Sequence, residues 1–289
     1  MNKIKIVDCP RDAMQGIHEF IPTEIKAEYI NSLLKIGFDT LDFGSFVSPK
    51  SIPQMRDTAD VLKRLELDSD GTKLLAIIAN FRGAKDACQF SEIKYLGFPF
   101  SISESFQMLN INASVKESLG RIEEINVVHK LCDMYDKYLV IYLSMAFGNP
   151  YGEEWSIELL DDYIKKLKSM GIKYIALSDT VGFSTPEVIK KIFNLYINEY
   201  PEIEFGAHFH STANTWKEKI EAAYQSGCRR FDGALRGYGG CPLAAYHLVG
   251  NVATENIIYY FHELGIETGI NFDALHYSIN LAQKVFPLY

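Results

Sequence analysis

The segment FGAHFHST, residues 205–212, places His208 and His210 two positions apart at the end of an apolar run. Residues i and i+2 of a strand point to the same face, so both imidazoles would converge on one side. Neutral imidazole binds divalent cations, which usually take oxygen ligands as well, and Asp12 could supply one if the first and seventh strands are close in a closed barrel. Alternatively, His208 is a hydrogen-bonded histidine of a barrel interior and His210 a solvated loop residue. The spacing leaves both interpretations open.

Two more side chains could handle charge and protons. Arg11 precedes Asp12, and an always-charged guanidinium beside a metal-bound carboxylate is suited to stabilising an oxyanion or enolate. A surface salt bridge is the alternative. Cys241 lies in GYGGCP with glycine at three of the four preceding positions, so the loop can move and its thiol could act as an acid or base near a metal. The alternative is an inert, small apolar residue in a tight turn.

The elements that position these residues follow from the alternation of short apolar runs with stretches of helical period. Strands are predicted at 4–7, 40–43, 74–79, 94–98, 138–144, 174–177, 204–208 and 230–233. Helices are predicted at 24–36, 114–135, 156–170, 186–200 and 215–225, with two further C-terminal helices at 253–264 and 272–288. Eight strand–helix units in 289 residues favour an α/β fold, a TIM (β/α)8 barrel with extra C-terminal helices from about residue 253, in one domain spanning 1–289.

A barrel of this kind places its chemistry after the C-terminal ends of the strands. Asp42 lies at the end of the second predicted strand, Asp179 follows the sixth, and Asn251 follows the eighth. Strand ends and loops are polar in most proteins, so each position taken alone is equally explained by solvation. Together with Asp12 and the two histidines, these residues predict a polar site at one end of the barrel.

Composition excludes several classes of protein. The net charge of −8 and the absence of a dense Lys/Arg run argue against a nucleic-acid or membrane-surface partner. Five widely spaced cysteines without a CxxC pair suggest neither a disulfide framework nor a cysteine zinc site, and they favour a reducing cytoplasm. The N-terminal residues enter a strand-like pattern at once and no apolar run reaches about 18 residues, so neither a signal peptide nor a membrane span is expected.

Seven segments occur along the chain in this order: PRDAMQG, SFVSPKSIPQM, NINASVKES, SDTVGFSTPE, HFHST, GYGGCP and GNVATEN. In these segments and their order, the chain closely resembles the 3-hydroxy-3-methylglutaryl-CoA lyase family. The resemblance extends from about Ile4 to the LGIETGINF segment near Asn271, and its most specific parts are SFVSPK and GGCP.

The resemblance implies a role for each matching residue. A divalent cation, Mg²⁺ or Mn²⁺, would be bound by Asp12, His208, His210 and Asn251. Arg11 would stabilise an enolate, Asp42 would replace a family glutamate, Asp179 would be a carboxylate near the reacting centre, and Cys241 would take part in proton transfer, with His208 counted among the catalytic residues. The implied reaction is metal-dependent cleavage of a 3-hydroxy acyl-CoA to acetyl-CoA and a 3-keto acid, in a homodimer.

The surroundings of these residues depart from the family. Asp8 and Cys9 change the first loop, which reads DCPRDA where the family has a sequence like VGPRDG, Asp42 is one methylene shorter than the expected glutamate, and Ser211 replaces an acidic residue. Two other functions therefore remain as alternatives: a transferase or aldolase of the same superfamily that joins an acyl-CoA to a 2-oxo acid or acts on a free hydroxy acid, and a barrel that binds metal or ligand without turnover.

Overall fold

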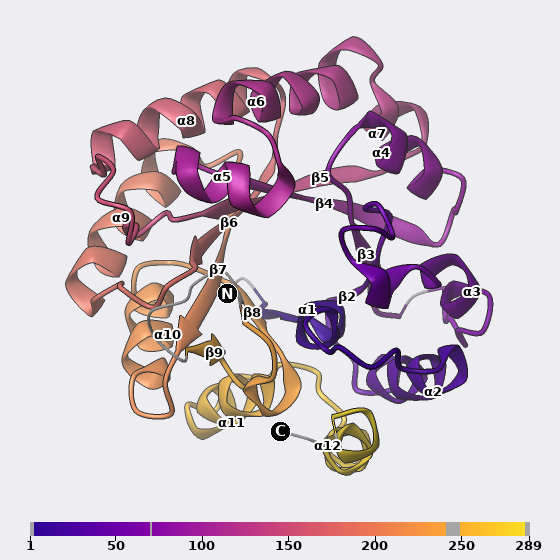
Figure 1. The fold of residues 1–289 in the computed structure, drawn as a ribbon. Coiled ribbons are helices and arrows are strands. Elements are labelled where there is room, and N and C mark those ends of the chain that lie inside the picture. The colour runs from indigo at the N-terminus through magenta and orange to yellow at the C-terminus, as the bar shows by residue number, and fades with distance from the viewer. Residues whose placement is uncertain (1–2, 70, 241–248, 287–289) are drawn as a thin grey trace.

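The computed structural model describes residues 3–69, 71–240 and 249–286, and its centre is a closed barrel of parallel strands (Figure 1). Each strand pairs with the next along the chain, and β8 pairs with β1, which confirms the predicted TIM (β/α)8 barrel. The strands are β1 (Lys5–Asp8), β2 (Thr40–Ser45), β3 (Lys73–Ile77), β4 (Ile93–Ser101), β5 (Tyr138–Ser144), β6 (Tyr174–Asp179), β7 (Glu204–Ser211) and β8 (Arg230–Gly233). A two-residue strand, β9 (Gly250–Asn251), pairs antiparallel with the end of β7.

Helices surround the barrel as an outer ring, and the two C-terminal helices lie together at one side of it (Figure 1). Several begin with a side-chain cap, for example Ser156 before α8 and Thr185 before α9, where Pro186 takes the first helical position. Among the helices described, none is long and apolar enough to cross a membrane. The helices are α1 (Pro10–Gln15), α2 (Thr23–Leu34), α3 (Thr58–Leu62), α4 (Phe81–Ala87), α5 (Glu104–Ile111), α6 (Val115–Glu123), α7 (Leu131–Met134), α8 (Ile157–Ser169), α9 (Pro186–Glu199), α10 (Trp216–Gln225), α11 (Thr254–Glu263) and α12 (Phe272–Val285).

The prediction of a single helix at 114–135 is wrong. The segment divides into α6, a π-helical turn over Glu124–Val128, and α7. Lys130 interrupts it with a left-handed backbone, φ 46°. An apolar periodicity can continue across such a break, because a π-turn rotates the chain without removing the apolar face.

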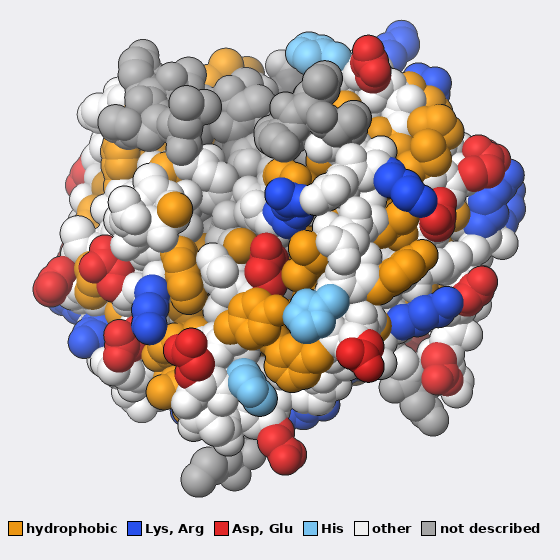
Figure 2. Space-filling model, turned by 90° about the horizontal axis from the view of Figure 1, so that it is seen from below, with side chains coloured by type: hydrophobic (Ala, Val, Ile, Leu, Met, Phe, Trp, Pro, Cys, Tyr) orange, Lys and Arg blue, Asp and Glu red, His pale blue; other side chains and the backbone are white. Residues whose placement is uncertain are grey.

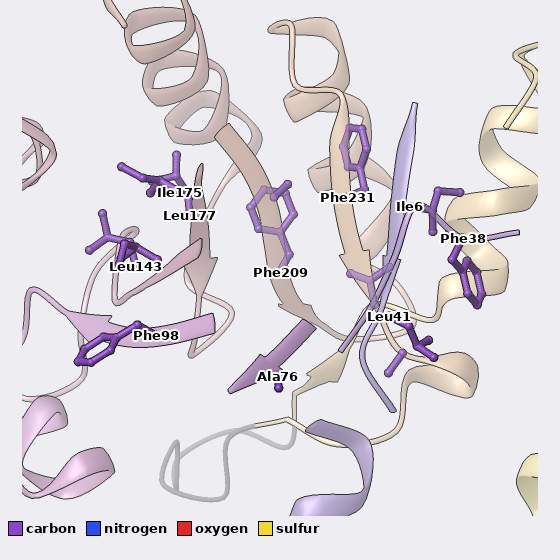
Figure 3. Close-up of a cluster of buried hydrophobic side chains, with 14 of the residues drawn as sticks. Ile6, Phe38, Leu41, Ala76, Phe98, Leu143, Ile175, Leu177, Phe209 and Phe231 are labelled. Carbon is purple, nitrogen blue, oxygen red and sulfur yellow. The ribbon is translucent and has the colours of Figure 1, made fainter. Parts of the chain in front are cut away.

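The core forms two layers, because alternate residues of each strand point inward and outward. Outward side chains such as Phe98, Leu177 and Phe209 pack beneath the helices (Figure 3). A smaller inner cluster fills the barrel, and Tyr95 and Tyr142 are its largest members. The inner layer therefore packs beneath the side chains at the mouth of the barrel.

The surface seen in Figure 2 mixes acidic, basic and apolar side chains. On that face, the described side chains form no continuous block of one charge. This distribution agrees with the modest net charge of −8.

Candidate active site and metal centre

A cavity of about 490 Å³ opens at the C-terminal end of the barrel strands. A slightly larger cavity, about 530 Å³, lies at the opposite end among residues such as Lys3, Phe38 and Lys73, and none of the predicted site residues lines it. The cavity at the C-terminal end of the strands is therefore the candidate active site. Its lining includes the predicted residues Arg11, Asp12, His208 and His210, together with Gln15, Tyr142, Ser144, Ser178 and Thr180.

Both histidines lie within one strand. β7 continues to Ser211, three residues beyond the predicted end at 208, because its last part pairs with β9. The i and i+2 positions place the rings of His208 and His210 on the same face, with their centroids 5.7 Å apart. Both line the cavity, so the sequence expectation that they converge is met by the geometry.

Each imidazole has one nitrogen engaged away from the cavity. His208 Nδ1 lies 3.2 Å from Oδ2 of Asp232, its direct neighbour on β8. His210 Nδ1 donates to the backbone carbonyl oxygen of Thr180 at 2.8 Å, since that oxygen can only accept. With Nδ1 protonated in both rings, Nε2 is the nitrogen left to bind a cation, which is the usual arrangement around metal-binding histidines.

The two histidines have opposite shifts of pKa. Burial lowers the pKa of His208, but the hydrogen bond and the charge of Asp232 outweigh it and raise that pKa above its ordinary value. Burial, reinforced by the nearby His208, lowers the pKa of His210. Asp232 therefore controls the proton on His208, whereas His210 is held neutral at neutral pH.

Asp12 and Asn251 could supply oxygen ligands. The Asn251 amide donates to Oδ2 of Asp12 at 2.7 Å, although 239 positions separate them in the sequence. Burial alone would raise the pKa of Asp12, but the charges of Arg11, His208 and His210 outweigh it and lower that pKa. Two imidazole nitrogens, a carboxylate and an amide make a donor set suited to Mg²⁺ or Mn²⁺, and the engaged Nδ1 atoms fit that purpose.

Arg11 connects two carboxylates. Its Nε donates to both oxygens of Asp42 at 3.2 and 3.0 Å, and its Nη2 also donates to Asp42. Its Nη1 donates to Asp12 at 3.1 Å and to Gln15 at 2.8 Å. Burial raises the pKa of Asp42 to about 6 despite the guanidinium, so Asp42 is still ionised at neutral pH. The arrangement fixes a positive charge beside the candidate ligand Asp12.

Asp179 is not brought to the cavity. Its neighbours Ser178 and Thr180 line the cavity, so the alternation of β6 turns Asp179 toward the helices. There its carboxylate accepts hydrogen bonds from Ser184 and from Lys219 of α10, the latter at 2.6 Å. Lys219 also donates to the carbonyl oxygen of His210 at 3.2 Å. Asp179 was expected as a carboxylate near the reacting centre, but it lies in a buried ion pair with Lys219, which also bonds to the end of β7.

Cys241 lies outside the described residues, which stop at Gly240 and resume at residue 249. The described residues that precede it, up to Gly240, pass very close to α1. At Gly239, with φ +85°, an added Cβ would lie 2.8 Å from Cα of Ala13 and 3.0 Å from the Asn251 amide nitrogen. Only glycine fits there, so the glycines of GYGGCP serve close packing beside Asp12 and Asn251.

The residues that orient the histidines were not predicted from the sequence. Asp232 lies inside a predicted strand, and its charge at an inward position was the available signal. Thr180 acts through its backbone, which no residue type reveals. Although Ser211 replaces an acidic residue of the family, Asp232 supplies a carboxylate that orients His208 from the neighbouring strand.

Comparison with known proteins gives one family. The family model described as HMGL-like matches residues 3–281. The chain is 35% identical over 271 residues to the cytoplasmic 3-hydroxy-3-methylglutaryl-CoA lyase of Homo sapiens, covering 93% of this chain and 71% of that one. It is 33% identical over 266 residues to a hydroxymethylglutaryl-CoA lyase of Bacillus subtilis, covering 92% of this chain and 87% of that one.

Solved structures agree. The HMG-CoA lyase of Bacillus subtilis superposes with a TM-score of 0.90 at 31% identity, covering 98% of this chain and 93% of that one. An HMG-CoA lyase from Acinetobacter baumannii, solved in complex with coenzyme A and 3-methylmalate, gives a TM-score of 0.90 at 30% identity, covering 99% of this chain and 92% of that one. The similarity therefore spans the barrel and the C-terminal helices.

Proposed function

This chain belongs to the HMGL-like family and is a carbon–carbon lyase that cleaves 3-hydroxy-3-methylglutaryl-CoA, and we propose that Asp12, His208, His210 and Asn251 hold its divalent cation. The observation that supports this most directly is the pair of histidines, each with Nδ1 engaged and Nε2 available at the cavity. Mg²⁺ and Mn²⁺ suit the mixed oxygen and nitrogen donors.

The reaction we propose is a retro-Claisen cleavage. The C3 hydroxyl loses its proton, the C2–C3 bond breaks, and C3 becomes the ketone of a 3-keto acid such as acetoacetate. The electron pair passes to the thioester as an enolate, and protonation at C2 gives acetyl-CoA. A bound divalent cation supplies Lewis-acid chemistry, which lowers the pKa of a substrate hydroxyl and favours its deprotonation.

Arg11 is the residue we propose for the developing negative charge. Its guanidinium is buried, lines the cavity and is held on both sides by Asp42 and Asp12. A donor fixed in this way needs no reorganisation as charge develops on the enolate oxygen. Asp42 acts through Arg11, because it does not line the cavity itself. For protonation at C2 we retain Cys241, on the family resemblance alone.

The alternatives are less favoured. The condensing transferases and aldolases of the superfamily share the barrel, but the two curated relatives compared above, at 35% and 33% identity, are lyases. A barrel without turnover does not explain the buried Arg11 between two carboxylates at the cavity. Binding of acyl-CoA agrees with the solved relative that contains coenzyme A. A homodimer, a single domain over 1–289 and a cytoplasmic location stay predictions.

The first test measures acetyl-CoA release from 3-hydroxy-3-methylglutaryl-CoA with Mg²⁺, with Mn²⁺ and with chelator. We expect turnover that requires the cation and that is lost in His208→Ala. His276→Ala, which changes an imidazole on α12 that bonds to Tyr259, is the matched control and should retain activity. Calorimetric titration with Mn²⁺ separates the two parts of the proposal: a His208→Ala protein that binds Mn²⁺ as wild type does would overturn the ligand assignment.

A further inference from the structure

Three buried side chains, one directly after β1 and the others on β7 and β8, meet inside the barrel, and one of them is the candidate metal ligand His208. Cys9, His208 and Asp232 each place one donor atom within 4.8 Å of the other two. Their positions are fixed by the backbone: His208 and Asp232 are direct partners between β7 and β8, and the Cys9 amide donates to the Gly233 carbonyl at 2.8 Å. The cluster is therefore part of the barrel rather than an accident of flexible side chains.

Among the described residues, two polar atoms at this cluster lack hydrogen-bond partners. Among the atoms of the described residues, Oδ1 of Asp232 and the hydroxyl of Tyr142 are buried without a hydrogen bond. The Tyr142 ring packs edge-on against His208, with centroids 5.4 Å apart, and its hydroxyl is close enough to Asp232 and Cys9 for their charges to raise its pKa further, after burial. Buried polar atoms without partners are rare in proteins and call for a ligand or a role.

We propose that Cys9, His208 and Asp232 form an inner binding site for a thiophilic divalent cation, of which Zn²⁺ is the type. Cysteine, histidine and aspartate are the ligands that Zn²⁺ takes in proteins, at about 2.3 Å for sulfur and about 2.0–2.2 Å for nitrogen and oxygen. Those bond lengths require donors roughly 3.3–3.8 Å apart in a tetrahedral site, so the cluster needs to contract by about 1 Å. His208 Nδ1 and Asp232 Oδ2, at 3.2 Å, are already close to this spacing.

The charges balance at this site. The thiolate is the form of cysteine that binds metals, so Cys9 releases its proton to solvent when the cation enters. Thiolate and Asp232 carboxylate together neutralise a charge of +2. The other oxygen of Asp232, Oδ1, faces Arg230, whose Nε is 3.7 Å away, and this leaves Oδ2 for the cation.

The inner site and the catalytic site share one imidazole. A neutral imidazole has one proton and one free nitrogen lone pair. In the catalytic arrangement the proton is on Nδ1, toward Asp232, and Nε2 is free. A cation bound to Nδ1 moves that proton to Nε2, which then presents an N–H to the catalytic position. Occupation of the two sites is therefore mutually exclusive at His208, and a bound inner cation inhibits the lyase. Only this inhibition rests on the proposed function.

X-ray absorption at the zinc edge tests the site without any assay of activity. Metal-free protein loaded with one equivalent of Zn²⁺ should show a Zn–S distance of about 2.3 Å. The sulfur signal should disappear in Cys9→Ser and in Cys9→Ala, and remain in Cys88→Ser, which changes another buried cysteine. Two Cys9 variants guard against one that does not fold. Co²⁺ gives a second readout, because a thiolate ligand adds a sulfur-to-cobalt charge-transfer absorption band.

Two results would overturn the inner site. One is a zinc environment of nitrogen and oxygen alone in the wild type. The other is a sulfur signal that survives in both Cys9 variants and is lost in Cys241→Ser. For the inhibition, we expect Zn²⁺ to raise the Mn²⁺ concentration needed for half-maximal activity, and to do so at least about tenfold less in Cys9→Ser. Equal inhibition of both proteins would show that Zn²⁺ acts elsewhere.

Discussion

His210 lies directly opposite Asn251 across the antiparallel pairing of β7 with β9. β9 contains only two residues, and they pair with His210 and Ser211 at the end of β7. The pairing places the Asn251 amide 2.7 Å from Asp12. The position of one candidate ligand therefore depends on how closely a two-residue strand approaches the barrel.

Gly250→Ala tests that approach. A Cβ at this position would lie 2.7 Å from the backbone oxygen of Gly237, so β9 must move away from the turn beside it. We expect weaker Mn²⁺ binding by calorimetry, about tenfold, as for other changes that displace a ligand's support. Gly120→Ala is the control, since Gly120 is an exposed residue of α6 and an added Cβ there meets nothing within 4 Å. Unchanged affinity in Gly250→Ala would mean that Asn251 does not bind the cation.

Asp232→Asn tests the orientation of His208. The neutral amide holds the Nδ1 proton less strongly than the carboxylate does, so Nε2 becomes a poorer ligand. We expect the affinity for Mn²⁺ to fall about 10- to 100-fold in the folded protein. Asp86→Asn, on the exposed surface of α4, should bind Mn²⁺ as the wild type does. A wild-type titration for Asp232→Asn would contradict the orienting role.

Arg11→Lys separates charge from geometry. Lysine keeps the positive charge but cannot donate to Asp42, Asp12 and Gln15 at once. Steady-state kinetics should show a kcat lowered about 10²- to 10³-fold, as for the loss of an oxyanion donor, while Mn²⁺ still binds. Arg82→Lys, on the surface, should leave kcat unchanged. If Arg11→Lys keeps full kcat, a fixed guanidinium is not needed for the enolate.

Lys219→Met tests the buried pair with Asp179. The change leaves the carboxylate buried without its cation, and loss of one partner of such a pair costs about 3–5 kcal/mol of the free energy of unfolding. Urea denaturation measures it, with exposed Lys217→Met as the control. Stability within about 0.5 kcal/mol of wild type would show that the pair is not structural.

Asp8→Asn should change the dependence of stability on pH. Burial raises the pKa of Asp8 to about 8, although the hydroxyl of Thr254 donates to it. The unfolded chain has the ordinary value near 4, so the folded protein holds this proton more tightly. The stabilisation that results is complete below pH ~4 and is lost as the pH rises through about 8.

Urea denaturation of both proteins from pH 5 to 9 measures this effect. The free energy of unfolding of Asp8→Asn, relative to wild type, should increase from pH 5 to about 8 and level off above it. Groups that titrate in both proteins cancel in this difference, and Asp86→Asn controls for the loss of an acidic residue. A constant difference would mean that Asp8 is already ionised at pH 5.

The strands could be predicted from sequence because each is a short apolar run, and their number indicated the barrel. His208 and His210 could be placed because a strand fixes the direction of alternate side chains. The short helices α1, α3, α4 and α5 were missed, since fewer than three turns give no clear period. Asp179 was expected near the reacting centre, and its direction could not be predicted because the sequence did not fix where β6 ends. Asp232 was missed because its role depends on the register between β7 and β8, which no local pattern contains.

β6 gives its neighbouring residues separate tasks. Ser178 and Thr180 face the substrate cavity, while Asp179 between them is tied to Lys219 beneath the helices. A mutagenesis library aimed at new acyl substrates can therefore vary Ser178 and Thr180 and leave the buried Asp179–Lys219 pair intact. The same library extended to Asp179 would consist largely of destabilised proteins, because each change there breaks the buried pair with Lys219.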